Sequence, residues 1–83
     1  MTAAQRAWLA HVRNAKVAWP TPALVQARVA NACKKLGWTE KIWSDGTNRL
    51  TLSMMVLLPE IFSSRWEHIG DCITDAGRKA LDE

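Results

Sequence analysis

Hydrophobic residues recur at helical spacing from the start of the chain. The apolar positions of this first stripe are Ala4, Trp8, Leu9, Val12 and Ala15. Thr2 precedes the stripe as a capping residue, and Gln5 stands three positions later as the partner of a capping box. The pattern predicts a first helix over about residues 2–16.

The next apolar pattern is bounded by strong start and stop signals. Pro20 excludes the helical conformation from the residue before it, and Thr21 can cap a new helix with a proline at its first position. Gly37 is the left-handed residue expected after the last turn, and Trp38 supplies the apolar contact of such a cap. We therefore expect a second helix over residues 21–36.

The two faces of this second helix differ in character. The predicted buried stripe is Val25, Val29, Ala32, Cys33 and Leu36. The predicted outer face holds small and basic residues: Ala23, Ala27, Asn31 and Lys34, flanked by Ala30 and Lys35. Small side chains allow a helix backbone to approach a partner closely, but alanine is also simply a good helix former. Both interpretations remain open.

Beyond Gly37 the pattern indicates short extended elements. Residues 39–43 can form a strand, and Asp-Gly at the centre of residues 44–48 predicts a turn. The alternation of Leu50, Leu52, Met54 and Val56 favours a second strand, whereas a helix over residues 53–58 is the alternative. The choice stays open at this point. We expect Ile61, Phe62 and Trp66 to anchor a loop against the core.

The end of the chain predicts a last helix over residues 74–82, because Thr74 can cap it and Asp75 favours its positive end. The segment Ile73-Thr74-Asp75-Ala76-Gly77-Arg78-Lys79-Ala80-Leu81 resembles the junction between wing and helix in the multiple-antibiotic-resistance regulator and PadR-like families of winged-helix proteins. Lys34-Lys35-Leu36-Gly37-Trp38 resembles the end of a recognition helix.

The resemblance implies an α+β, mostly helical, winged-helix-like fold with a small β-hairpin or wing between the second and last helices. We expect residues 1–83 to form one such domain. Two departures from the family pattern are visible. Residues 1–38 hold two helices rather than three, and the wing segment over residues 39–73 is long. These departures put the usual docking geometry on DNA in doubt.

The charge is distributed unevenly along the chain. Residues 1–41 carry seven basic residues and one acidic residue, a net charge of +6, whereas residues 42–83 carry four basic and seven acidic residues, a net charge of −3. A basic half beside an acidic half points to a polyanion-facing side. The alternative is a scatter of solvated lysine and arginine side chains.

Enzymatic motifs are absent, since the sequence has no phosphate-binding glycine loop, nucleophile elbow or His-Glu zinc motif. The possible zinc ligands His11, His68, Cys33 and Cys72 lack paired spacing, so we expect no metal and no cofactor. We expect the cysteines to be free thiols of a cytoplasmic protein. The longest apolar run, residues 54–58, is far too short to span a bilayer.

These features predict a small, non-enzymatic DNA-binding protein, of the kind found as phage or prophage transcriptional regulators. The candidate nucleic-acid-binding residues are Arg28, Asn31, Lys34, Lys35 and Arg49, with Arg6 and Arg13 as secondary contacts. The alternative is a phage-encoded inhibitor of the anti-CRISPR or host-takeover type, which binds a host protein complex. Trp43 and Trp66 are then the exposed interface candidates. A homodimer is compatible with the first hypothesis.

Overall fold

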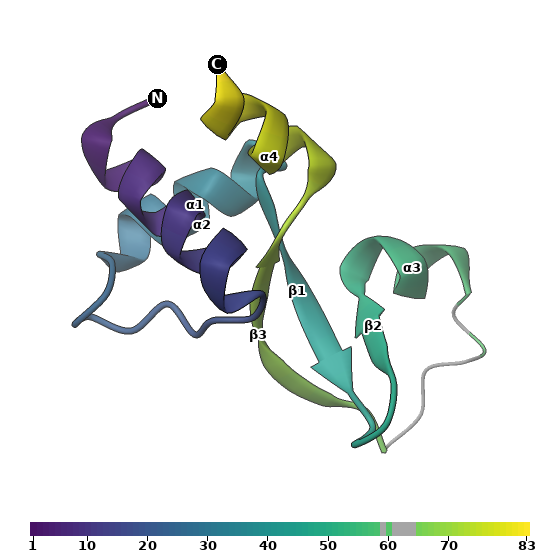
Figure 1. The fold of residues 1–83 in the computed structure, drawn as a ribbon. Helices are drawn as coiled ribbons and strands as arrows, with labels where there is room; N and C mark the ends of the chain where they lie inside the picture. Colours follow the sequence, from purple (N-terminus) through teal and green to yellow (C-terminus); the bar gives the residue numbers. More distant parts are fainter. Residues whose placement is uncertain (59, 61–64) are drawn as a thin grey trace.

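The computed structural model describes residues 1–58, 60 and 65–83. In the described residues, a three-stranded antiparallel sheet of order β2-β1-β3 has the helices α1, α2 and α4 gathered at one end and α3 on the other side, next to β2 (Figure 1). The elements are α1 (Ala3–Ala15), α2 (Ala27–Lys35), β1 (Thr39–Ser44), β2 (Arg49–Thr51), α3 (Leu52–Leu57), β3 (Glu67–Ile73) and α4 (Asp75–Asp82). The predicted α+β, mostly helical fold class is confirmed, and the arrangement is consistent with a winged-helix-like fold.

Helix α1 begins where its capping signal predicted. The backbone N–H of Gln5 donates to Thr2 Oγ1 at 3.1 Å, and the Thr2 N–H donates to Gln5 Oε1 at 2.9 Å. This reciprocal pair satisfies two of the donors that a helix start leaves free. Trp8, Leu9 and Val12 are almost fully buried and form the centre of the core. The prediction of this helix is therefore confirmed.

The second helix is shorter than predicted, because it begins at Ala27 rather than near Thr21. The Thr21 carbonyl accepts from the N–H groups of Leu24 and Val25, which makes a single turn. Gln26 then adopts an extended backbone with φ −69° and ψ 142° and interrupts the helix. This break lets Val25 enter the core, where it is 8% exposed.

The end of α2 follows the predicted cap. Gly37 has φ +78°, its N–H donates to the Lys34 carbonyl at 3.0 Å, and the Trp38 N–H donates to the Cys33 carbonyl at 2.9 Å. These two bonds form a Schellman motif, which needs a left-handed residue and therefore favours glycine. Trp38 packs against the core. Leu36, predicted to be buried, is 56% exposed because the chain turns away at this cap.

The buried face of α2 also differs from the prediction at Ala30. This residue was expected beside the outer face, but it is 1% exposed and belongs to the core with Cys33. The later start of the helix leaves its inward face to Ala30 and Cys33, with Val29 half-buried beside them. A small side chain at this position lets α2 lie close to the core residues of α1.

Strand β3 connects the first helix to the sheet. Ala18, in the link after α1, donates to the Asp71 carbonyl at 3.0 Å and accepts from the Asp71 N–H at 2.8 Å. Gly70, with φ +142°, lies so close to this link that a Cβ would meet the Ala18 carbonyl oxygen at 2.8 Å. The sheet is thereby held against the helices along the outer edge of β3.

The sequence left open whether residues 50–58 form a strand or a helix, and the structure contains both, one after the other. Arg49–Thr51 form β2, which pairs with β1 across the predicted turn, and Leu52–Leu57 form α3. Thr51 supplies the switch, because its hydroxyl accepts from the Met54 N–H at 3.3 Å and caps the helix. Trp66 is half-buried, and its predicted companions Ile61 and Phe62 lie outside the described residues.

The C-terminal motif joins the end of α2 to α4. Thr74 caps α4 by accepting from the Gly77 N–H at 3.0 Å, and its own hydroxyl donates to the Gly37 carbonyl at 2.5 Å. A methyl group on Gly77 would collide with the carbonyl oxygen of Trp38. The glycine therefore permits close approach of α4, and the predicted helix over residues 74–82 is confirmed.

Candidate nucleic-acid interface

Helix α2 presents three of the predicted contact residues together. Arg28, Asn31 and Lys35 are all exposed, and their spacing of three and four residues places them along one face of the helix. Ala27, on the adjoining turn, is also exposed and adds no bulk. The stripe is therefore a shallow polar surface with a cation near each end and an amide between them.

The guanidinium of Arg28 is oriented by its neighbour. Its Nε donates to the side-chain oxygen of Gln26 at 3.0 Å. The two terminal nitrogens of this planar, permanently charged group have no partner among the residues that the structure describes, and Arg28 is exposed. This is the geometry that pairs well with phosphate oxygens.

Lys34 forms an ion pair within the protein. Its ammonium lies 3.3 Å from Asp71 Oδ2, and the side chains are 27% and 0% exposed. Within the described part of the chain neither carboxylate oxygen of Asp71 accepts a well-formed hydrogen bond, so Lys34 balances the buried charge by proximity. The ring of His68 is the next polar group, 4.0 Å from Asp71 Oδ1. Lys34 is thus removed from the outer stripe.

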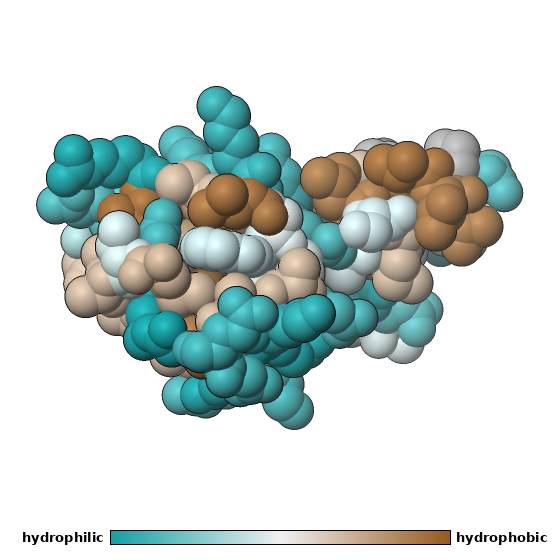
Figure 2. All heavy atoms as spheres, turned by 90° about the horizontal axis from the view of Figure 1, so that it is seen from above, coloured by the Kyte–Doolittle hydropathy of each residue, from teal (hydrophilic) through white to brown (hydrophobic). Residues whose placement is uncertain are grey.

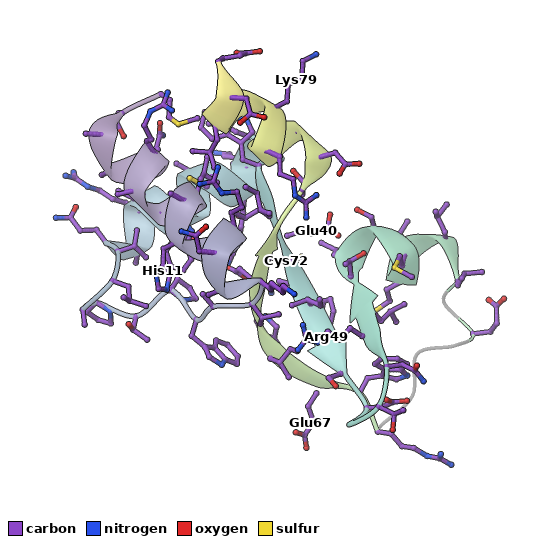
Figure 3. All side chains as sticks on the ribbon, in the orientation of Figure 1. His11, Glu40, Arg49, Glu67, Cys72 and Lys79 are labelled. Carbon is purple, nitrogen blue, oxygen red and sulfur yellow. The ribbon has the colours of Figure 1, made fainter. Side chains whose placement is uncertain are left out.

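The other predicted cations lie apart from α2. Arg6 donates to the carbonyls of Leu81 at 2.9 Å and Glu83 at 3.4 Å, so it ties α1 to the end of α4. Arg13 lines a hollow of about 900 Å³ between α1, the sheet and α4. Arg49 is exposed where β2 begins, beside the hairpin turn (Figure 3). The structure gathers Arg28, Asn31 and Lys35 and separates these three arginines from them.

The two helices α1 and α2 carry no acidic side chain. All eight acidic residues occur at position 40 or later, so neither α1 nor α2 carries a carboxylate. Repulsion of a polyanion by neighbouring carboxylates is therefore low along these helices. The uneven distribution of charge along the sequence therefore corresponds to two adjacent helices, α1 and α2, whose charged side chains are all basic.

The tryptophans are placed differently from the prediction. Trp43 and Trp66 are half-buried rather than exposed, whereas Trp19 is 50% exposed. The ring of His68 lies against both Trp19, with centroids 4.7 Å apart, and Trp43, with centroids 5.4 Å apart. Sequence reasoning missed this grouping because the three residues come from distant segments.

The two thiols are free and unsuited to nucleophilic attack at neutral pH. Burial raises the pKa of the Cys33 thiol. Burial, together with the negative charges of Glu40 and Asp71, raises the pKa of Cys72 to about 11. Both groups stay protonated near pH 7, and the thiolate is the reactive form. Among the described residues no three histidine, cysteine or acidic side chains cluster as metal ligands.

Comparisons with protein-family models, with curated proteins and with solved structures give no match to this chain. In the part of the chain that the structure describes, no helix has the length and apolar character needed to cross a membrane.

Proposed function

We propose that this protein binds double-stranded DNA through the exposed stripe of α2 formed by Arg28, Asn31 and Lys35. The observation that carries the proposal is the grouping of two cations without ion-pair partners and an amide on one face of a helix that carries no carboxylate itself. The two cations can neutralise phosphates and set the register of the helix on the duplex. The amide can form a bidentate contact to an adenine edge.

The rest of the fold supports this docking mode. The resemblance to winged-helix regulators rests on the end of α2 and on the junction of β3 with α4, and the bonds that Thr74 donates to the carbonyls of Gly37 and Trp38 join these two segments. Arg49 beside the hairpin is the natural contact for the neighbouring backbone. A regulator of transcription from a phage or prophage, working without a cofactor in the cytoplasm, is the role that fits these features.

Fluorescence anisotropy with a labelled random duplex at two salt concentrations tests the proposal. We expect Arg28→Ala with Lys35→Ala to weaken binding and to reduce the salt slope by about 2, because each lost phosphate contact contributes about 1. Lys79→Ala is the control for the single variant Lys35→Ala, since Lys79 is exposed on α4 and removes the same charge (Figure 3). Absence of DNA binding at low salt contradicts the proposal. Equal losses of affinity in Lys35→Ala and Lys79→Ala contradict it as well.

The second candidate function is inhibition of a host protein complex. The observation that favours it is the apolar surface of α3, where Val56 and Leu57 are 72% and 78% exposed. Protein interfaces commonly centre on such groups. If the protein fails to bind DNA, affinity purification from host cells should recover one stoichiometric complex that Val56→Ser with Leu57→Ser abolishes and Leu36→Ser leaves intact.

A further inference from the structure

Helix α3 exposes almost all of its large hydrophobic side chains. The residues of this α3 patch, exposed by 39% to 78%, are Leu52, Met54, Val56, Leu57 and Leu58. Figure 2 shows them as a continuous hydrophobic projection at one end of the molecule. Contiguous apolar surface of this kind on a small protein marks a contact site.

The folding of the chain by itself does not account for the patch. Helix α1 buries Trp8, Leu9 and Val12, and α2 buries Ala30 and Cys33, whereas α3 buries no residue. Its cap at Thr51 forms the helix locally and leaves its apolar side chains in water. Met55 is half-buried and Ser53 bonds to Glu40 of β1, but most of the apolar surface of α3 stays available to a partner.

The charge of the patch indicates which surface that is. Residues 50–58 carry no charge of either sign, although the whole chain has a net charge of +3. Nucleic acid and anionic lipid are bound through cations, which this segment lacks. An uncharged apolar surface is complementary to itself, because a two-fold axis brings no like charges together.

The neighbouring strand favours the same partner. Strand β2 lies at one edge of the sheet, and its outer edge pairs with no other strand among residues 1–58, 60 and 65–83. If two β2 strands met antiparallel about Leu50, Arg49 of each copy would face Thr51 of the other. No like charges would meet along this edge, so β2 and the α3 patch form one surface that a second copy can cover.

We propose that two copies of this protein associate about a two-fold axis through the α3 patch. The patch is smaller than the roughly 20–30 residues that each side of a standard interface contributes. The dimer is therefore weak, with a dissociation constant on the order of 10–100 µM. The α3 patch shares no residue with the stripe of Arg28, Asn31 and Lys35 on α2 (Figure 1), whereas β2 holds Arg49, the proposed contact for the neighbouring DNA backbone.

Sedimentation velocity over concentrations from about 1 to about 500 µM tests the interface. The unaltered protein should pass from monomer to dimer, and Val56→Glu with Leu57→Glu should weaken association at least about tenfold, because it places like charges across the axis. Leu36→Glu, at a residue 56% exposed outside the patch, should leave association unchanged. The protein with Val56→Lys and Leu57→Lys, mixed with the acidic variant, should form a heterodimer.

Other outcomes overturn the proposal. A monomer at every concentration rejects it, and an open series of larger species shows head-to-tail association instead. Binding of a persistent monomer to phosphatidylcholine vesicles would identify a lipid surface as the partner. At protein concentrations below the dissociation constant of the dimer, the neutral variant Val56→Ser with Leu57→Ser should bind DNA like the unaltered protein. DNA binding and dimerisation are thereby measured separately, and the failure of one proposal is distinguished from the failure of the other.

Discussion

The helix–sheet body and the β2–α3 segment are built by different rules. The body, comprising α1, α2, β1, β3 and α4, encloses a continuous core in which Leu9 and Cys33 are fully buried. The segment over residues 49–57 contributes only Leu50 to the buried residues, and its helix presents Leu57 to water. Apolar side chains of the same kind therefore stabilise the fold in the body, whereas in the segment they are exposed and available to contact a partner.

The largest expected effect is the difference in stability between a leucine-to-alanine substitution in the body and one in the segment. Leu9→Ala should lower the free energy of unfolding by about 2–5 kcal/mol, since it removes a fully buried side chain and leaves a cavity. Leu57→Ala should change it by less than about 0.5 kcal/mol at a protein concentration where the chain is monomeric. Urea denaturation of both variants measures the difference. Similar losses would mean that α3 belongs to the core.

The second effect concerns the buried ion pair that fixes α2 to the sheet. Lys34→Ala should cost about 3 kcal/mol, because it leaves the carboxylate of Asp71 buried without a counter-charge. We place the value at the low end for buried pairs because the Lys34 side chain is 27% exposed. Combining it with Asp71→Asn should remove most of the loss, and Lys35→Ala is the exposed control. Additive costs in the double variant would show that the two residues do not interact.

Local signals of the sequence were sufficient where structure is local. The capping box at Thr2 and Gln5, and the caps at Gly37 and Thr74, each act within a few residues, and each was predicted correctly. The start of α2 was predicted too early, because Val25 is drawn into the core by residues far away in the chain. Sequence patterns do not report such contacts.

The candidate site was predictable only in part for the same reason. Helical spacing predicted Asn31 on the outer face and Lys35 at its flank, and both are exposed, whereas it did not place Arg28 on that face. The pairing of Lys34 with Asp71 joins residues 37 positions apart, and no local signal announces it. The exposure of α3 was hidden for another reason, because the alternation of its apolar residues imitates a strand with one buried face.

The smallest effect reports how the segment is held against the body. Ser53 of α3 donates to Glu40 of β1 at 2.6 Å, and both line the hollow that also contains Cys72 (Figure 3). Burial and nearby carboxylates raise the pKa of Cys72 from 9.0 to about 11. Because the protonated thiol is favoured in the folded protein, its contribution to stability is complete below pH 9 and is lost as the pH rises through 11.

Alkylation of Cys72 by iodoacetamide, followed by mass spectrometry in a Cys33→Ala background, measures this pKa. The rate should keep rising up to about pH 11, since the thiolate is the attacking form. Ser53→Ala should shift the curve toward lower pH by admitting water to the hollow, whereas Ser44→Ala, in the hairpin, should leave it in place. Identical curves for both variants would mean that the bond to Glu40 does not hold α3 over Cys72. The body would then shield this thiol alone, and the segment would be free to meet its partner without any change at the sheet.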